Sequence, residues 1–461
     1  MFFLRNRKTP INTTSSYSHD VLCAFVLVAF CFSVQTALAK GIERESRHEF
    51  LVKTSSSARA VAFSVSSRSI LLPKPVLETP DGDWFKVIHY GVQADVGILE
   101  KQLSSTNDVI TFEPNFIWSA IGSTSTAPKD DDRTDPWPEL PPRLPRRGRK
   151  DPQLQKVWSL DKVGASEAWK IANNASNIIV GVIDSGVDYN HEDLVNNIWR
   201  NQAEIPNDGI DNDGNGFVDD VVGWDFVHGD NLPWDDNGHG THTAGTLGAT
   251  GGNGVGISGV SQRASILPLK FLSAAGEGTT EDAIRAIQYA VASGARVLSN
   301  SWGGETYSRA LEDAIVSAGR SDVLFVAAAG NDSSDNDSLP LYPAAYPLSN
   351  VLAVAATDRN DHLADFSNYG FTTVHLAAPG DFIWSTTPRN KYSVMSGTSM
   401  ACPLVAGASV LLRAFRPELN ALEIKDILLS SSDKLPELLN KVNSSGRLNV
   451  WQALRLASSS F

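Results

Sequence analysis

The feature that most constrains the fold is an alternation of short apolar segments with amphipathic ones from about residue 152 onward. The apolar segments are rich in β-branched residues and have the length of buried strands: NIIVGVID, SILPLKFL, ARVLSNSW, VLFVAAAGN and VLAVAATD. The segments between them have helical spacing: GTHTAGTLGAT, TEDAIRAIQYAVASG and RALEDAIVSAG. This alternation predicts an α/β fold with a mostly parallel sheet and helices on both faces. In such sheets the chemistry is found at the carboxyl ends of the strands.

Two further regions precede this large domain, which we place at 151–461. Residues 40–120 predict a small α+β domain, with strands in EFLVK, DWFKVIHYG and DVITFEPNFIW and a helix in DVGILEKQLS. Residues 121–150 are rich in proline and charge, so they predict an extended, exposed linker. A trypsin-like enzyme would easily cut its basic end, which consists of Arg146, Arg147, Arg149 and Lys150. A plain linker and a processing junction both fit this composition.

The amino terminus predicts export. Three basic residues (Arg5, Arg7 and Lys8) precede an apolar run at 21–34, which is short for a bilayer span. The small-residue pattern ALA at 37–39 follows. Together these features are typical of a signal peptide over residues 1–39, and a membrane anchor is the alternative. We therefore expect a secreted or periplasmic protein with no membrane attachment after signal removal.

Cysteine content and net charge restrict the function classes further. Cys23 and Cys31 lie within the signal peptide, so the mature chain keeps only Cys402 and forms no internal disulfide. Bound calcium would be another way to stabilise such an exported chain. The net charge of −13 argues against a nucleic-acid partner.

Three polar residues fall where strands end or helices begin. Asp184 ends the strand of VIDSGVD, His239 opens the helix of NGHGTHTAG, and Ser399 starts the apolar helix of SGTSMACPLVAGASVLL. Taken singly, each could be structural, since a serine in that place can cap a helix. His239 and His242, three residues apart, could also share a helix face and bind zinc, which would require further ligands nearby. The order Asp, His, Ser favours a catalytic set instead.

This order and its motifs resemble the subtilases, the subtilisin-like serine peptidases, over about residues 152–457. The resemblance rests on VIDSGVD, HGTHTAGT, NSWGG, AAAGN, AAPG and GTSMACPLVAG. It implies that Ser399 is the nucleophile, that His239 is its general base, and that Asp184 orients the imidazole. It also implies that Asn331 donates to the oxyanion together with the Ser399 backbone N–H.

The same resemblance implies a peptide-binding groove. Its edge would pair with the backbone of an extended substrate through three residues: Ser301, Trp302 and Gly303. The pocket for the side chain before the cut would be lined by Ala328, Ala329 and Gly330. Small residues there leave a roomy slot, so we expect large apolar or aromatic side chains to be preferred. Asp332, beside the pocket, could also admit a basic side chain.

Two regions predict calcium binding. The resemblance implies one site through Asp193 and Asn253. The glycines that follow, Gly254, Gly256 and Gly259, match a dinucleotide-binding motif, but they follow a helix instead of a strand, so we reject that interpretation.

The second region is the acidic loop NDGIDNDGNGFVDD, which is dense in the oxygen ligands that calcium prefers. Its candidate ligands are Asp211, Asp213, Asn215, Asp219 and Asp220. The loop resembles the opening of an EF-hand with Gly216 at the sixth position, but Val222 stands at the twelfth position instead of glutamate. A solvated acidic turn is the alternative.

These patterns, together with the resemblance to the subtilases, imply an exported, calcium-stabilised, monomeric serine endopeptidase that acts on proteins or peptides. Residues 40–120 resemble the family's propeptide through EFLVK and VITFEPNF, which implies a zymogen folded and inhibited by its own propeptide. The family usually has a small residue in place of Cys402 and a histidine in place of Leu404, and we expect these departures to alter packing more than chemistry. By the same resemblance, His242 is structural. The competing class is a catalytically silent relative that serves as a calcium-dependent binding module; the complete catalytic set favours the enzyme.

Overall fold

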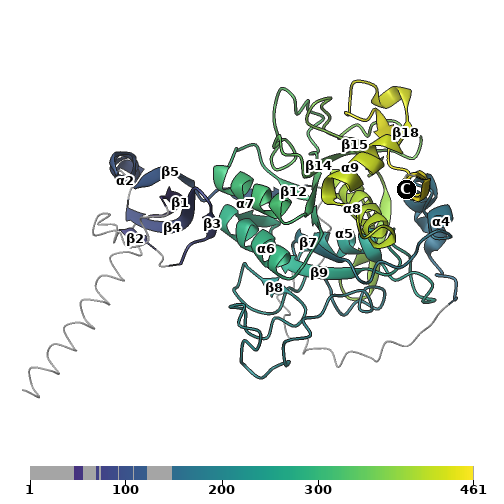
Figure 1. The fold of residues 1–461 in the computed structure, drawn as a ribbon, viewed down its shortest axis with the longest axis horizontal. Helices are drawn as coiled ribbons and strands as arrows, with labels where there is room; N and C mark the ends of the chain where they lie inside the picture. Colours follow the sequence, from purple (N-terminus) through teal and green to yellow (C-terminus); the bar gives the residue numbers. More distant parts are fainter. Residues whose placement is uncertain are drawn as a thin grey trace, which may run out of the picture.

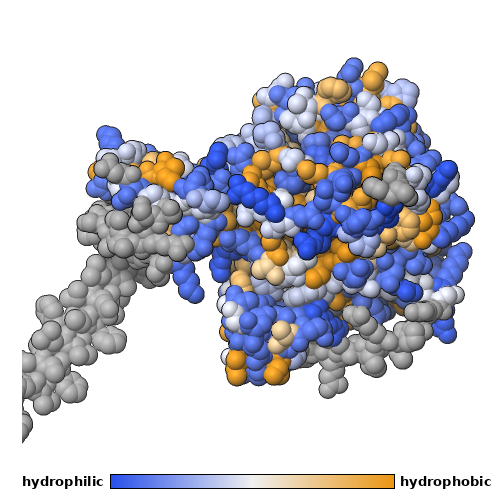
Figure 2. All heavy atoms as spheres, viewed as in Figure 1, coloured by the Kyte–Doolittle hydropathy of each residue, from blue (hydrophilic) through white to orange (hydrophobic). Residues whose placement is uncertain are grey.

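The computed structural model describes residues 46–55, 69–71, 74–91, 93–106, 108–121 and 148–459. The predicted signal peptide and most of the predicted linker lie outside these ranges. The described chain forms a small N-terminal lobe beside a large body, and the two are joined at a narrower contact (Figure 1, Figure 2).

A nine-stranded sheet runs through the large body. Its strands are β7 (Ile179–Asp184), β8 (Trp224–Asp225), β9 (Ser265–Lys270), β11 (Val297–Asn300), β13 (Leu324–Ala328), β14 (Val351–Thr357), β15 (Leu376–Pro379), β18 (Asp433–Lys434) and β19 (Gly446–Arg447). Their order across the sheet is β18-β19-β15-β14-β13-β11-β7-β9-β8. The neighbouring pairs are parallel except β18 with β19 at one edge. The predicted α/β class with a mostly parallel sheet is therefore confirmed.

Helices cover both faces of this sheet. Their bounds are α5 (His239–Gly248), α6 (Thr280–Ala292), α7 (Arg309–Arg320) and α8 (Thr398–Phe415). Successive strand residues point to opposite faces. In β7, Val180 and Val182 pack in the cluster that contains α5 and α8, whereas Ile183 packs in the cluster that contains α6 and α7. Burial on both faces of the sheet explains why the sequences of these strands are continuously apolar.

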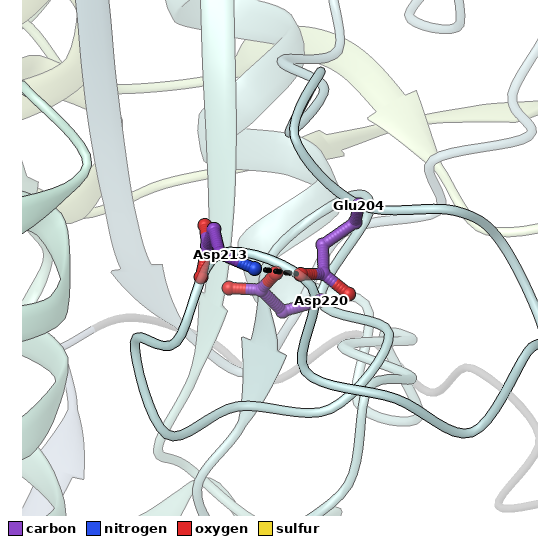
Figure 3. Close-up of side chains that lie close together, drawn as sticks. All are labelled: Glu204, Asp213 and Asp220. Atoms are coloured by element: carbon purple, nitrogen blue, oxygen red, sulfur yellow. Dashed lines mark hydrogen bonds between the residues drawn. The ribbon is translucent and has the colours of Figure 1, made fainter.

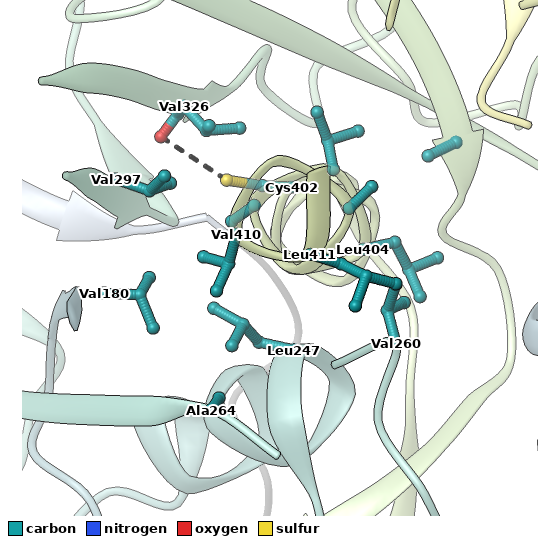
Figure 4. Close-up of a cluster of buried hydrophobic side chains, with 14 of the residues drawn as sticks. Val180, Leu247, Val260, Ala264, Val297, Val326, Cys402, Leu404, Val410 and Leu411 are labelled. Atoms are coloured by element: carbon teal, nitrogen blue, oxygen red, sulfur yellow. Dashed lines mark hydrogen bonds between the residues drawn. The ribbon is translucent and has the colours of Figure 1, made fainter. Parts of the chain in front are cut away.

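Helix α8 is buried along almost its whole length. Figure 4 shows it end-on, surrounded by the apolar side chains of the sheet and of α5. Its length and composition would suit a membrane span, but 89% of its apolar window is buried inside the protein. It is therefore a core helix of the large body.

The N-terminal lobe is an antiparallel sheet with one helix. Its elements are β1 (Ser46–Thr54), β2 (Ser69–Leu71), β3 (Leu77–Thr79), β4 (Gly82–Gly91), α2 (Gln93–Ser105) and β5 (Val109–Pro114). The strand order is β2-β4-β1-β5, with β3 added on β4. Leu99 and Leu103 of α2 pack against Phe50 and Val52 of β1. The predicted α+β region before the large domain is confirmed.

The segment DVITFEPNFIW forms two strands instead of the single one expected. Strand β5 ends at Pro114, and β6 (Ile117–Ala120) leaves the lobe and enters the large body. There it lies antiparallel between β10 (Glu277–Thr279) and β12 (Trp302–Gly303). Pro114 has no N–H to continue the first ladder. The next residue, Asn115, still donates its backbone N–H to the Glu49 carbonyl of β1, while its amide oxygen accepts a hydrogen bond from the Glu281 backbone in α6.

The lobe docks on α6 and α7 through charged contacts. Lys86 pairs with Glu281, and Lys53 pairs with Asp313 at 2.9 Å. The Glu113 carboxylate accepts hydrogen bonds from the Ser308 hydroxyl at 2.6 Å and from the Arg309 backbone at 2.8 Å. An acidic side chain thus sits at the positive end of the α7 dipole, where it is favoured.

The remaining elements complete the large body. They are η2 (Leu154–Lys156), α3 (Trp158–Lys162), α4 (Ala165–Ala168), β16 (Ile383–Thr387), β17 (Lys391–Met395), α9 (Ala421–Ser430), η3 (Pro436–Leu438) and α10 (Val450–Ser459).

Candidate active site

A buried carboxylate–imidazole pair lies at the carboxyl end of the central strand β7. Asp184 is the last residue of β7 and His239 is the first residue of α5, and each is at most 1% exposed. His239 Nδ1 lies 2.7 Å from Asp184 Oδ1. Burial alone would lower the pKa of His239, but the Asp184 carboxylate opposes this effect and raises the pKa above its ordinary value. The pair therefore stabilises an imidazolium.

A second buried carboxylate fixes the loop that delivers His239. Asp235 accepts hydrogen bonds from the Gly238 backbone at 2.7 Å and from both the backbone and the hydroxyl of Thr241. It also accepts one from the hydroxyl of Ser185, the residue after Asp184. Asp235 thus ties the end of β7 to the start of α5. Asp235 could not be selected from sequence patterns, because its role depends on two segments that meet only in the fold.

Ser399 lies in the first turn of α8 and is fully buried. Its hydroxyl donates to the Ser301 carbonyl at 3.1 Å, and the Ser301 hydroxyl donates to the Ser399 carbonyl at 3.0 Å. His239 Nε2 has no hydrogen-bond partner of good geometry in the described part of the chain. The structure thus brings the three predicted polar residues to one end of the sheet, from β7, α5 and α8.

Asn331 follows β13 and faces the same helix start. Its side-chain oxygen accepts hydrogen bonds from the Thr398 backbone at 2.9 Å and from the Thr398 hydroxyl at 3.0 Å. The Thr398 hydroxyl in turn accepts a bond from the Gly330 backbone. Since the oxygen is occupied, the amide NH₂ group is the part of Asn331 left to donate to a ligand.

Within the described residues, His242 belongs to no group of potential metal ligands. It is fully buried, and its Nε2 lies 3.1 Å from the Ile383 carbonyl and 3.3 Å from the Ser393 carbonyl. Burial, together with the nearby His239, lowers the pKa of His242 to about 3, so the ring is neutral. Its contacts to β16 and β17 make it a packing residue.

The predicted groove edge is occupied by the chain itself. Gly303 and Trp302 pair with Ser119 and Ala120 of β6, and the Ile121 backbone N–H donates to the Ser301 carbonyl at 3.0 Å. The Ile121 backbone also lies close enough to His239 to contribute to its raised pKa. The segment from the N-terminal lobe therefore reaches the buried carboxylate–imidazole pair at Ile121.

The residues predicted to line the pocket for the side chain before the cut belong to two different apolar clusters. Ala328 is buried in the same cluster as Ile121 and Leu341, whereas Ala329 packs in a separate cluster with Ala355 and Val374. Gly330 adjoins Leu341 and Asn368, since a Cβ added to it would lie 2.8 Å from the Leu341 side chain and 2.3 Å from the Asn368 amide. Leu341 was not selected from the sequence. It lies ten residues beyond Asn331, and only the fold returns it to the groove.

Three carboxylates of the acidic loop region lie close enough to hold a metal ion. They are Glu204, Asp213 and Asp220, whose nearest oxygens lie within 4.8 Å of one another (Figure 3). Glu204 also accepts a hydrogen bond from the Asp213 backbone at 3.1 Å. Asn215, another predicted ligand, donates its amide to both Asp213 and Asp220.

Two of the predicted acidic ligands lie outside this cluster. Asp211 accepts hydrogen bonds from the backbone of Gly214, Asn215 and Gly216, and Asp219 accepts them from the backbone of Asp208 and Gly209. These two carboxylates stabilise the turns of the loop. Glu204 was missed because it lies before the acidic loop, seven residues ahead of Asp211, and is turned back onto the loop by the fold.

The second predicted calcium region also gathers acidic and amide side chains. Asn253 donates to Asp193 at 2.7 Å, and Asp193 is fully buried. Burial raises the pKa of Asp193 to about 7. Asp151, missed in the sequence, accepts hydrogen bonds from the Gly252, Asn253 and Gly254 backbones. The glycine-rich loop that matches the dinucleotide motif thus contacts two carboxylates. Its backbone N–H groups donate hydrogen bonds to Asp151 and Asp193.

Cys402 and Leu404, the two departures from the family pattern, are fully buried in the core around α8 (Figure 4). The Cys402 thiol points to the Val326 carbonyl at 3.5 Å. Burial raises the pKa of this thiol to about 11, so it stays protonated and unreactive.

Comparison with known proteins agrees with this arrangement. Residues 175–447 match the model of the subtilase family, Peptidase S8. The chain is 37% identical over 294 residues to thermitase of Thermoactinomyces vulgaris, which covers 64% of this chain and 94% of thermitase. It is 38% identical over 287 residues to the thermophilic serine proteinase of Bacillus sp. (strain AK1), which covers 62% of this chain and 64% of that protein.

The chain is also similar to a protease from a parasite. It is 36% identical over 320 residues to subtilisin-like protease 1 of Plasmodium vivax, which covers 65% of this chain and 51% of that protein. The chain therefore spans about half the length of this relative. The chain belongs to the subtilase family, as the resemblance of its motifs predicted.

Proposed function

We propose that this chain is an exported serine endopeptidase that is made as a zymogen and cuts peptide bonds with Ser399, His239 and Asp184. The observation that carries the proposal is the buried Asp184–His239 pair beside the first turn of α8, with a peptide segment already lying along the adjoining edge. An orienting carboxylate, an imidazole and a hydroxyl at a helix start are the parts of a Ser-His-Asp hydrolase.

In the proposed reaction, the Ser399 hydroxyl turns from the Ser301 carbonyl toward Nε2 of His239, which takes its proton. The hydroxyl oxygen attacks the carbonyl carbon of the substrate, and His239 then gives the proton to the leaving amine. Asp184 holds Nδ1–H and stabilises the transient imidazolium. Water then attacks the acyl-enzyme and gives a proton to His239. His239 returns that proton to the Ser399 oxygen as the ester bond breaks.

The oxyanion that forms on the substrate carbonyl would be bound by Asn331 and the Ser399 backbone N–H. Thr398 supports this role, because it occupies the Asn331 side-chain oxygen from two directions and leaves the NH₂ group to donate. A donor held in place before the reaction loses little energy to reorganisation when charge develops. The start of α8 adds the positive end of a helix dipole.

The N-terminal lobe supports the zymogen proposal. It inserts β6 into the substrate edge and places Ile121 beside His239. An antiparallel strand in this place excludes other peptides from the groove. We therefore assign the bond between Ile121 and Gly122 as the first one cut, and the basic run near Arg146 as a second place for trimming.

Calcium is the proposed structural ion. Carboxylate and amide oxygens at the cluster of Glu204, Asp213 and Asp220 are the donors that calcium prefers. Asp193, buried beside Asn253, is a second candidate, since a nearby cation would relieve the burial of its charge. In both places calcium would stabilise the fold and take no part in peptide cleavage.

Export rests on the signal-like pattern of residues 1–39, which lies outside the described structure. Expression of the full-length gene in a secreting host should release the protein into the medium or periplasm without residues 1–39. N-terminal sequencing of intracellular and released forms would measure this. A released form that retains residues 21–34, or a membrane-bound form, would refute it.

The direct test of the catalytic proposal uses a fluorophosphonate probe and intact mass. Wild-type protein should be shortened and labelled on Ser399, whereas Ser399→Ala should stay full length and unlabelled. Ser409→Ala is the matched control, because Ser409 lies on the same helix with its hydroxyl bonded to the Val405 carbonyl. Equal shortening in the Ser399→Ala and wild-type chains, or no labelling of shortened wild type, would refute the proposal and favour a silent binding module.

A further inference from the structure

The segment in the groove indicates which peptides fit it, provided that the proposed peptidase function is correct. Ile121 occupies the place of the residue before the cut, because its backbone bonds to Ser301 and lies beside His239. Counting back along β6, Trp118 occupies the fourth place before the cut. Both side chains are buried, at 8% and 1% exposure, whereas Ser119 between them is exposed. The groove can therefore select peptides by the side chains at the first and fourth positions before the cut.

Leu341 fills the pocket that receives Ile121. A Cβ placed on Gly303 would lie 2.9 Å from Ile121 Cδ1 and 3.0 Å from Leu341 Cδ2. A Cβ placed on Gly330 would lie 2.8 Å from the same Leu341 Cδ2. The Leu341 side chain thus lies close to both glycines, and at Gly330 the Asn368 amide lies closer still, 2.3 Å from the same Cβ position. Leu341 therefore takes up part of the slot expected from the small residues at 328–330, and the Ile121 side chain lies in the space that remains.

Leu341 cannot easily move out of this space. The next residue, Tyr342, exchanges two backbone hydrogen bonds with Gly304, each 2.9 Å long. The Tyr342 ring packs against Tyr346 at 4.7 Å and against Tyr307 at 5.5 Å between ring centres. A larger side chain before the cut would therefore have to displace a segment that is held by both backbone and aromatic contacts.

The fourth place is shaped for an indole. Trp118 packs edge-to-face on Trp302, with ring centres 5.8 Å apart, and its Nε1–H donates to the Thr280 hydroxyl at 2.9 Å. Thr280 is fully buried at the start of α6. A Cβ on Gly304 would lie 3.2 Å from the Trp118 ring, so the glycine leaves the room that a wide ring needs. Phenylalanine could fill part of this space but has no N–H to donate to Thr280.

We propose that the groove selects peptides with tryptophan at the fourth residue before the cut and a β-branched aliphatic residue immediately before it, and that Thr280 and Leu341 set these two preferences. A hydrogen bond in a buried pocket discriminates against a ligand that lacks the donor. Overpacking of a filled pocket discriminates against a larger side chain.

The test of the Leu341 assignment uses self-matured, full-length-expressed enzyme and fluorogenic peptides of sequence Trp-Ser-Ala-X with a coumarin leaving group. We expect kcat/KM to be about tenfold or more higher with isoleucine than with phenylalanine at X. Leu341→Ala should reduce or reverse this ratio by raising kcat/KM for phenylalanine. Leu339→Ala, an exposed residue of the same segment, should leave the ratio unchanged. A ratio near one in wild type, or one that Leu341→Ala does not change, would overturn the assignment.

The test of Thr280 compares tryptophan with phenylalanine at the fourth place and keeps isoleucine before the cut. We expect wild type to prefer tryptophan by about tenfold. Thr280→Val should remove most of this preference, and Thr280→Ser, which restores the hydroxyl, should recover it. An unchanged preference in Thr280→Val would overturn the role of this hydroxyl.

Labelling of Ser399 by a fluorophosphonate separates failure of the inference from failure of the proposed function. Each enzyme sample is titrated with the probe, and rates are expressed per labelled molecule. Labelled wild type with no selectivity at either place refutes the inference alone. Wild type that is neither labelled nor able to cleave any of these peptides refutes the proposed function and this inference with it.

Discussion

Asp313 on α7 should control how firmly the N-terminal lobe closes the groove. Its carboxylate accepts a hydrogen bond from Lys53 Nζ at 2.9 Å and from the Trp84 indole at 3.0 Å. The Lys53 side chain is only 2% exposed, and its other partner, Asp81, is 68% exposed. Asp313→Ala would leave a buried ammonium group with one solvent-exposed partner and a buried indole N–H without its acceptor.

The cost of this change follows from these contacts. Loss of a hydrogen bond to a charged group costs about 1.5–3 kcal/mol. Complete loss of a partner from a buried ion pair costs about 3–5 kcal/mol, and Asp81 remains to reduce that figure. We therefore expect docking to weaken by about 2 kcal/mol, which corresponds to about 30-fold in the equilibrium between docked and undocked lobe.

Amide hydrogen exchange on the uncleaved Ser399→Ala chain measures this change. The backbone N–H groups of Ala120 and Ile121 are bonded to the large body, so undocking exposes them. Their protection should fall by about 30-fold in the Asp313→Ala background, whereas amides of the buried helix α8 should keep theirs.

Glu312→Ala is the matched control. It removes the same charge from the neighbouring position of the same helix, but the Glu312 carboxylate contacts Tyr307 and Arg309, both within the large body. We expect less than about a threefold change in protection at Ile121. Equal protection of Ile121 in Asp313→Ala and its parent would refute the docking argument, and an equal loss throughout α8 would show that the large body itself was destabilised.

Three further predictions concern catalysis and calcium. His239 must be neutral to act as a base, and the Asp184 carboxylate raises its pKa. We therefore expect kcat/KM to fall as the pH is lowered, with a midpoint above 6.5 in the pH–rate profile. A midpoint below 6.5 would contradict the effect of Asp184. Asn331→Ala should lower kcat by about 100- to 1,000-fold, the usual loss for this donor in a subtilisin-type site, with little change in KM; a loss confined to KM would contradict an oxyanion role. Calcium at a hundred times its Kd should stabilise the protein by about 2.7 kcal/mol, so a chelator should lower the Tm. The Tm should fall less in Glu204→Gln than in wild type or in the control Asp211→Asn. Equal Tm shifts in wild type and both variants would contradict the assigned cluster.

The fold class and the candidate catalytic residues could be predicted because the patterns that indicate them involve residues close together in the chain. A strand buried on both faces needs a continuous apolar run, and the polar residue that follows it lies at the edge of the sheet. Asp184 and Ser399 stand directly at such boundaries, at the end of β7 and the start of α8.

The residues that were missed act across long separations in the chain. Asp235 joins two segments that meet only in the fold, and Asp151 is brought to a loop about 100 residues further along. Glu204 replaces Asp211 and Asp219 near the other carboxylates, because hydrogen bonds within the loop turn those two toward backbone amides. The alternating spacing of the acidic residues could not reveal which carboxylates converge.

The sequence by itself determined the parallel sheet, its family and the order of the catalytic residues, because periodicity and short motifs depend on neighbours in the chain. Only the tertiary structure decided what fills the groove. The second half of one predicted strand leaves its own lobe as β6 and pairs with β10 and β12, and Leu341 narrows the pocket where Ile121 lies. Pairing partners and pocket volume depend on which distant surfaces meet, and that is fixed by packing of the whole chain.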